Sequence, residues 1–256
     1  MPYVIYEKKG RIAYITLNRP ERLNALGAEL SAELREAEAD FARDPELWVA
    51  IYTGTGRAFS AGADLRDAAE RGRQTGSVRA ARGAGGVRTV IESWKPTIAA
   101  INGICYGGGL ERAMGCDIRI CSENATFAMA EVKRGVSPGT GLHDLARLIG
   151  MGDALWMLLS GDPIDAREAL RVRLVNRVVP PEELMPTATR MAEIICENSP
   201  FAVRNIKQVA KLSVEMPRDY AQSLGQAWSD RVWSSEDARE GVAAFAEGRK
   251  PVWKGR

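Results

Sequence analysis

The pattern of apolar and polar positions predicts alternating strands and helices up to about residue 180. Short, nearly continuous runs of apolar and β-branched residues, which are typical of buried strands, occur at residues 4–7, 12–17, 48–53, 97–101, 117–121 and 174–179. Apolar residues spaced three and four apart predict helices at residues 26–41, 142–149, 154–160 and 166–171. This alternation indicates an α/β domain.

After Pro180 the pattern becomes purely helical. The spacing of apolar residues predicts helices at 182–197, 201–212, 217–232 and 236–247, and Ser234-Ser235-Glu236-Asp237 is a typical helix start. We therefore divide the chain into an α/β core over residues 1–195 and a helical region over residues 196–256. Because so small a set of amphipathic helices often packs on a neighbouring subunit, we expect the protein to be an oligomer.

Composition and charge exclude several classes of protein. The 256 residues are 45% hydrophobic and 27% charged, and 35 Lys and Arg against 33 Asp and Glu leave a net charge of +2. This balance argues against a nucleic-acid partner or an anionic membrane. No run approaches the roughly 20 apolar residues of a membrane span, and the N-terminal residues lack the apolar segment of a secretory signal. We expect a cytoplasmic protein.

Histidine and cysteine usage narrows the possible chemistry. His143 is the single histidine, which excludes a metal site built from two or three imidazoles, and we expect no metal. The four cysteines form no C-x-x-C pair, so they are expected to be buried thiols in a reducing compartment. Neither a dinucleotide-binding nor a P-loop glycine motif is present. Proton transfer therefore falls to carboxylates, Tyr, Lys or Cys.

Residues 66–88 depart from the overall charge balance. The stretch is rich in Gly and Ala and holds two acids against six arginines, which are Arg66, Arg71, Arg73, Arg79, Arg82 and Arg88. Exposed basic loops are common, so one interpretation is a solvated loop. The other is a cationic rim for an anionic substrate tail, because guanidinium groups match phosphate oxygens in geometry.

Two glycine-rich turns each follow a predicted strand. The first is Ala58-Phe59-Ser60-Ala61-Gly62-Ala63-Asp64-Leu65, and the second is Gly103-Ile104-Cys105-Tyr106-Gly107-Gly108-Gly109-Leu110-Glu111. Glycines let the backbone approach a ligand closely, and the first N–H groups of a following helix have no intrahelical partner. Two such turns could aim two N–H groups at one oxygen, as an oxyanion hole requires.

Glu111 and Glu131 are the candidate acid and base. Their neighbours in the sequence are mostly apolar, which favours burial, although most glutamates lie on helix surfaces. Twenty positions apart, the two side chains cannot share one regular element. Only the fold could bring them together, and the spacing leaves that open.

Several segments together resemble the crotonase superfamily, and enoyl-CoA hydratases most closely. The matching segments are Leu17-Asn18-Arg19-Pro20, Leu23-Asn24-Ala25-Leu26, Phe59-Ser60-Ala61-Gly62-Ala63-Asp64-Leu65, Asn102-Gly103, Gly107-Gly108-Gly109-Leu110-Glu111, Cys116-Asp117-Ile118-Arg119, Gly135-Val136-Ser137-Pro138-Gly139, Glu236-Asp237-Ala238-Arg239-Glu240-Gly241 and Arg249-Lys250-Pro251-Val252-Trp253-Lys254-Gly255-Arg256. Each is weak alone, but their joint order and spacing are specific and cover nearly the whole chain.

The resemblance implies a crotonase-like spiral of ββα units with a C-terminal α-helical trimerisation region. It implies a homotrimer or a dimer of trimers, acting on an acyl-CoA thioester without a separate cofactor. The expected reaction is the addition of water across the C2=C3 double bond of a 2-enoyl-CoA. A Δ3-Δ2 enoyl-CoA isomerase is the alternative within the family, and an RNA-binding or scaffold protein on this fold is the alternative outside it.

The resemblance also implies roles for residues at matching positions. The N–H groups of Ala63 and Gly108 would form the oxyanion hole, Glu111 would activate water, and Glu131 would supply the proton to C2. The CoA-binding positions would be Arg22, Ser60, Ala61, Asp64, Leu65, Arg66, Phe245 and Lys254, the last two through a neighbouring subunit. Arg112 stands where relatives carry a small or apolar residue, so its charge could act on Glu111 or be paired elsewhere.

Overall fold

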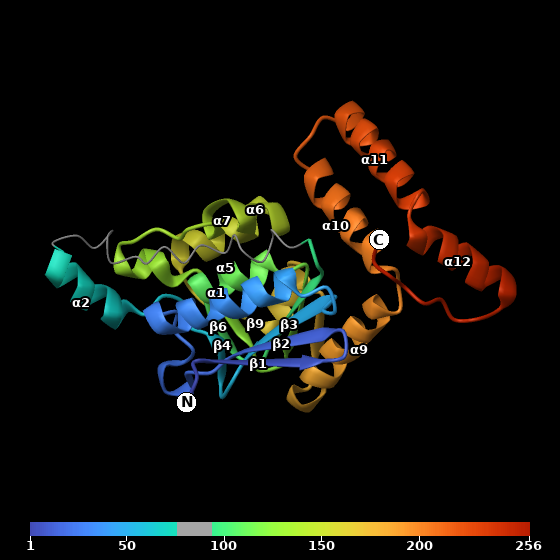
Figure 1. Cartoon of the computed structure of the whole chain (residues 1–256). Coiled ribbons are helices and arrows are strands. Elements are labelled where there is room, and N and C mark those ends of the chain that lie inside the picture. Colours follow the sequence, from blue (N-terminus) through green and yellow to red (C-terminus); the bar gives the residue numbers. More distant parts are fainter. Residues whose placement is uncertain (76–93) are drawn as a thin grey trace.

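Two β-sheets form the centre of the molecule (Figure 1), and the computed structural model describes residues 1–75 and 94–256. The larger sheet has the order β1-β2-β3-β5-β7-β10, and the smaller has the order β4-β6-β8-β9. The strands of the larger sheet are β1 (Val4–Lys9), β2 (Ile12–Leu17), β3 (Val49–Gly54), β5 (Thr97–Ile101), β7 (Ile118–Ser122) and β10 (Arg177–Val179). Those of the smaller sheet are β4 (Ala58–Ser60), β6 (Ile104–Tyr106), β8 (Thr126–Ala128) and β9 (Ile164–Asp165).

The chain visits the two sheets alternately, which makes the predicted spiral. β3, β5 and β7 are each followed within a few residues by a strand of the smaller sheet, and a helix comes next. Pairing is parallel except for the β1–β2 hairpin and the β8–β9 pair. The sequence pattern locates the strands of the larger sheet but misses those of the smaller one. They span two or three residues, too few to show a periodicity.

Helices surround the sheets and extend the chain at its C-terminal end (Figure 1). The α-helices are α1 (Ala28–Arg43), α2 (Leu65–Thr75), α5 (Gly108–Gly115), α6 (Gly141–Leu148), α7 (Met151–Ser160), α8 (Ala166–Arg171), α9 (Leu184–Cys196), α10 (Pro200–Ser213), α11 (Arg218–Trp233) and α12 (Glu236–Glu247). The 3-10 turns are η1 (Pro20–Arg22), η2 (Ala130–Arg134) and η3 (Pro181–Glu183). Within the described residues, no helix is both long and apolar enough to cross a membrane.

Both faces of the central strands β3 and β5 are buried, which explains their continuous apolar runs. Along β3, Ala50 and Tyr52 pack into a core shared with α1 and α5, whereas Val49 and Ile51 face the opposite way, toward α9. Successive strand residues point to opposite faces, so one apolar run supplies both cores. The four cysteines are free thiols. Three of them are buried, as the sequence predicts, whereas Cys196 is half-buried.

The stretch that begins at Arg66 is helical rather than a loop as far as Thr75. Its first ten residues belong to α2, and the Asp64 side chain accepts hydrogen bonds from the N–H groups of Arg66 and Asp67 at the start of that helix. Such capping favours a helix over a solvated loop. Arg79, Arg82 and Arg88 lie outside the described residues.

The three last helices project from the core beyond α9 (Figure 1). α10 is fastened to the core by Lys207 and Lys211, whose ammonium groups lie 2.7 and 2.8 Å from the carboxylate of Asp117 at the start of β7. The predicted division after residue 195 falls at the end of α9, and treating the two parts as separate domains remains a prediction.

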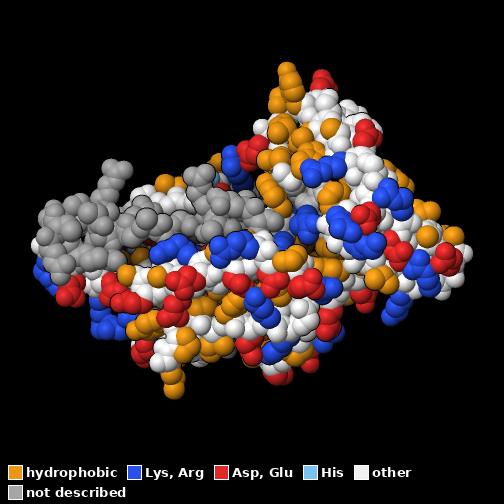
Figure 2. All heavy atoms as spheres, in the orientation of Figure 1, with side chains coloured by type: hydrophobic (Ala, Val, Ile, Leu, Met, Phe, Trp, Pro, Cys, Tyr) orange, Lys and Arg blue, Asp and Glu red, His pale blue; other side chains and the backbone are white. Residues whose placement is uncertain are grey.

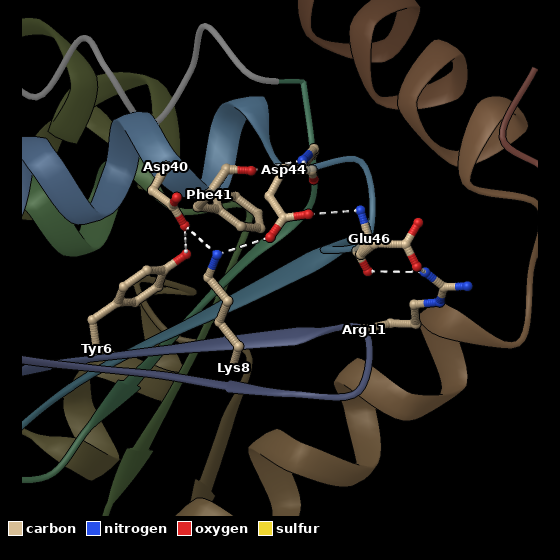
Figure 3. A network of polar contacts seen from close by, with 8 residues as sticks. Tyr6, Lys8, Arg11, Asp40, Phe41, Asp44 and Glu46 are labelled. Carbon is tan, nitrogen blue, oxygen red and sulfur yellow. Dashed lines mark hydrogen bonds and ion pairs between the residues drawn. The ribbon is translucent and has the colours of Figure 1, made fainter.

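Lys95 joins the core to the C-terminal end of α1. Its Nζ donates hydrogen bonds of 2.6 Å to the carbonyls of Phe41 and Asp44, and its side chain is buried. Figure 3 shows the neighbouring surface network, in which Lys8 lies between the carboxylates of Asp40 and Asp44. Burial lowers the pKa of Lys95 to about 8, with the charge of Arg204 acting in the same direction.

This buried lysine makes stability depend on pH. Below pH 8 the ammonium is charged in both states, and only the folded state bears the cost of its burial. Between pH 8 and about 10.5 the unfolded chain holds more protons, so the contribution of Lys95 to the free energy of unfolding rises with pH. The free energy of unfolding of wild type and of Lys95→Met is measured with urea at pH 7 and pH 10. We expect the value for wild type, relative to that of the variant, to be higher at pH 10 than at pH 7. A difference that stays constant or shifts the other way would contradict this.

Candidate active site

A pocket of about 520 Å³ opens between η1, the turn before α2 and η2. This volume lies within the range of small-molecule sites. It is lined by Pro20, Glu21, Arg22, Leu23, Ala25, Arg57, Ala61, Ala63, Asp64, Leu65, Arg66 and Arg134. The pocket therefore brings together many of the residues expected to bind CoA, although they come from separate segments of the chain.

Arginines give the pocket its charge. Arg22, Arg57, Arg66 and Arg134 line it, and all four side chains are exposed. The sequence motifs do not single out Arg57 or Arg134 as CoA-binding residues. Arg57 immediately precedes the first glycine-rich turn, which is a signal that could have identified it. Arg134 lies far along the chain and reaches the pocket only through the fold. Such a group of guanidinium side chains suits phosphate groups.

Ser60 and Asp64 shape the turn with their side chains. The hydroxyl of Ser60 is buried, donates to the carbonyl of Asn24 and accepts from the N–H of Gly62, and Ser60 does not line the pocket. One Asp64 carboxylate oxygen caps α2, while the other lies 2.9 Å from Nη1 of Arg19. Both groups hold the backbone that carries Ala61 and Ala63.

The two glycine-rich turns meet at Gly62 and Gly107. Both residues have positive φ angles, +89° and +50°, which side-chain-bearing residues rarely adopt. A Cβ on Gly62 would lie 3.0 Å from the nitrogen of Gly108, and one on Gly108 would lie 3.7 Å from the nitrogen of Ala63. A Cβ on Gly62 would also lie 2.8 Å from the carbonyl oxygen of Tyr106, so the turns can approach this closely only because Gly62 has no side chain.

The N–H groups of Ala63 and Gly108 are both available to a ligand. Ala63 forms a parallel bridge with Leu26, in which the N–H of Leu26 donates to Gly62, and Gly108 begins α5. Within residues 1–75 and 94–256, neither N–H donates to a protein acceptor. Two adjacent unsatisfied donors form the arrangement needed to bind an oxyanion.

Glu111 lies one turn into α5 and is held by a loop. Its Oε1 accepts hydrogen bonds from the N–H groups of Gly139 at 2.5 Å and Gly141 at 3.0 Å. A Cβ on Gly141 would lie 3.3 Å from the same oxygen and 2.6 Å from the terminal methyl of Met129. The glycine-containing segment after η2 thus fixes this carboxylate through its backbone.

Glu131 reaches the same turn from η2. Its Oε1 lies 2.8 Å from the position that a Cβ on Gly107 would occupy. Gly107 directly precedes Gly108, and the N–H of Glu111 donates to the carbonyl of Gly107. The carboxyl group of Glu131 therefore lies against the turn from which α5 begins, and Glu111 stands in the first turn of that helix.

Arg112 points away from this centre. Its Nη1 lies 2.5 Å from Oε1 of Glu38 on α1, and both side chains are almost fully buried. Of the two possibilities left by the sequence, Arg112 is therefore paired elsewhere. The charge of this buried arginine is balanced by a partner 74 positions away.

Phe245 and Lys254 lie away from the pocket of their own chain. Phe245 on α12 is 90% exposed, and the ammonium of Lys254 lies 3.2 Å from the carboxylate of Glu236. Neither residue lines the pocket. Their contact with CoA through a neighbouring subunit remains a prediction.

Comparisons with known proteins agree in both sequence and fold. A family model described as enoyl-CoA hydratase/isomerase matches residues 7–256. The chain is 41% identical to carnitinyl-CoA dehydratase of Citrobacter koseri, over 98% of each protein. It is 40% identical to short-chain-enoyl-CoA hydratase of Clostridium acetobutylicum, over 96% of this chain and 95% of that protein. The structure of an enoyl-CoA hydratase from Mycobacterium tuberculosis H37Rv superposes with a TM-score of 0.91 at 35% identity, covering 100% of both chains. The chain therefore belongs to the enoyl-CoA hydratase/isomerase family of enzymes and has their α/β spiral fold.

Proposed function

We propose that the enzyme adds water across the C2=C3 double bond of a short-chain 2-enoyl-CoA thioester. The observation that carries this proposal is the position of the Glu131 carboxyl against Gly107, next to the unpaired N–H groups of Ala63 and Gly108, with Glu111 one turn into the helix that follows. The name of the relative from Clostridium acetobutylicum supports the choice of a short acyl chain.

The oxyanion hole would stabilise the charge that develops on the thioester oxygen. When a nucleophile adds at C3, electrons move through C2 to the carbonyl and form an enolate. The N–H groups of Ala63 and Gly108 would donate to that oxygen, and losing one such donor typically costs about 3–4 kcal/mol of transition-state stabilisation. Ala63 also lines the pocket, so a ligand in the pocket extends toward these donors.

Glu111 would act on the attacking water. Its Oε1 is occupied by two backbone N–H groups, whereas Oε2 accepts no hydrogen bond within the described part of the chain. Oε2 can therefore accept a hydrogen bond from water and direct its oxygen to C3. The two bonds to Oε1 would hold the carboxylate in one orientation and so lower the entropic cost of that alignment.

Glu131 would deliver the proton that C2 receives. The carboxyl group approaches Gly107 from the η2 side, next to the oxyanion donors. In the complete reaction the water oxygen bonds to C3, one water proton replaces the proton given to C2, and the enolate collapses to the thioester. The hydration reaction written in this way requires no metal or cofactor beyond the CoA that the substrate carries.

The arginines at the pocket would bind the anionic part of CoA. Arg22, Arg57, Arg66 and Arg134 offer guanidinium groups from several directions, and phosphates are the most highly charged groups of the proposed substrate. The expected cytoplasmic location and the expected absence of a nucleic-acid partner belong to the same proposal.

Two related reactions are outcomes of the same assay. An isomerase that moves a double bond from C3 to C2 needs mainly one carboxylate, so the presence of two favours hydration. The relative named carnitinyl-CoA dehydratase indicates the reverse reaction, in which water is lost. A panel containing 2-enoyl-CoA, 3-enoyl-CoA and carnitinyl-CoA esters would identify the acyl group. Turnover of a 3-enoyl-CoA with no hydration of any 2-enoyl-CoA would establish an isomerase instead.

Neutralising either glutamate tests its role. Glu111→Gln and Glu131→Gln keep the side-chain shape but remove the ionisable carboxyl, so we expect kcat for 2-enoyl-CoA hydration to fall by at least about 100-fold with little change in substrate affinity. Glu123→Gln, at an exposed position, is the control and should keep wild-type kcat. Loss of the enoyl thioester absorbance gives the rate. If either site variant retained near-wild-type hydration, that glutamate would not be an acid or base.

Adding a methyl group at Gly107 tests the close approach of the turn. In Gly107→Ala the new Cβ would lie 2.8 Å from Oε1 of Glu131, and the residue would be held at a φ of +50°. We expect kcat to fall at least tenfold, because the carboxylate or the turn must move. Gly152→Ala on α7 is the matched control, since its Cβ would meet nothing within 4 Å. Equal activity of the two variants would contradict the proposed geometry.

The projecting helices support the expected homotrimer or dimer of trimers. None of the 16 residues of α11 is buried, and its Tyr220 and Trp233 are about 70% exposed. Figure 2 shows apolar side chains gathered on this projecting part. Large exposed apolar surfaces usually mark interfaces. We expect light scattering to give three or six times the chain mass of 27.9 kDa, and a Tyr220→Asp/Trp233→Asp variant to give a smaller assembly. A wild-type mass equal to one chain would exclude the trimer.

A further inference from the structure

The arginine at the end of η2 connects the pocket to the candidate reaction centre. Arg134 lines the pocket together with Arg22, Arg57 and Arg66, and it is the last residue of η2. Glu131 is the second residue of the same five-residue turn. One short turn therefore presents a guanidinium group to the pocket and a carboxyl group to Gly107.

Hydrogen bonds within η2 and just after it connect the two ends of the turn. Nη1 of Arg134 donates a 3.0 Å hydrogen bond back to the carbonyl of Ala130, and the N–H of Val136 donates to the carbonyl of Glu131 at 3.2 Å. An ion pair between Lys133 and Asp162 fastens the middle of the turn to the segment after α7. These contacts couple the position of Arg134 to that of Glu131.

The other arginines of the pocket lack this connection. Arg22 belongs to η1, which carries neither glutamate, and Arg57 precedes β4. Arg66 lies in α2, which carries neither glutamate. Arg134 is therefore the pocket arginine that shares a structural unit with a candidate proton donor.

We propose that Arg134 is a positioning residue, which binds the phosphate-bearing tail of the CoA ester and thereby holds η2 so that Glu131 faces the substrate. This rests on the proposed function. Binding energy from a part of the substrate remote from the reacting atoms is used here to orient a catalytic group, so it raises kcat as well as affinity. An ester without phosphates cannot make this contact and gains nothing from Arg134 beyond its hydrogen bond to Ala130.

The test compares a full and a truncated substrate. Hydration of but-2-enoyl-CoA and of but-2-enoyl-pantetheine, which lacks the phosphates, is measured for wild type, Arg134→Ala, Arg134→Lys and Arg22→Ala. With the CoA ester, Arg134→Ala should raise KM and lower kcat, each about tenfold, as expected from losing a charge-assisted hydrogen bond. With the pantetheine ester it should match wild type within about twofold. Arg134→Lys should recover part of the kcat, and Arg22→Ala should raise KM for the CoA ester without lowering kcat.

Each alternative result overturns the proposal. A kcat that falls equally on both esters would show a general structural effect, and an unchanged kcat on the CoA ester would show that Arg134 does not act on Glu131. Wild-type turnover decides the hydratase function separately. Calorimetric titration with free CoA needs no turnover, and an Arg134→Ala affinity for CoA equal to that of wild type would overturn the contact itself.

Discussion

The site depends on the contact between two backbone turns that have no room for side chains. Gly62 and Gly107 adopt positive φ angles, and a Cβ on either would collide with the opposite turn or with Glu131. Because the backbones approach so closely, two N–H groups from distant segments can address one oxygen. The glycines lose more conformational entropy on folding than other residues would, and the surrounding sheets supply the packing that offsets this cost.

The spiral topology explains why these turns meet. Each circuit passes from the larger sheet to the smaller one and then into a helix, so the ends of β4 and β6, which pair in parallel, lie side by side. The first turn leads into α2 and the second into α5, and both helices begin at the same edge of the smaller sheet. The next circuit adds η2 after β8, which pairs with β6 and brings Glu131 to that edge.

Ion pairs hold the surrounding elements in place. The buried Glu38–Arg112 pair joins α1 to α5, and the partly buried Asp117 joins β7 to α10 through Lys207 and Lys211. Burying such charges is costly, so these pairs add little net stability. Removing one partner, however, would leave an uncompensated charge in the core. Arg112 therefore ties α5, the helix that begins at Gly108 and carries Glu111, to α1.

Apolar periodicity over five or more residues reflects burial directly, so the sequence predicts the α/β class, the strands of the larger sheet and most of the helices, but not α2. Its motifs also singled out Ala63, Gly108, Glu111 and Glu131 as candidates. The strands of the smaller sheet, the partner of Arg112, the approach of Glu131 to Gly107, and the places of Arg57 and Arg134 in the pocket are apparent only in the folded chain. These features depend on contacts between residues far apart in the chain, and local patterns carry no information about which distant residues become neighbours.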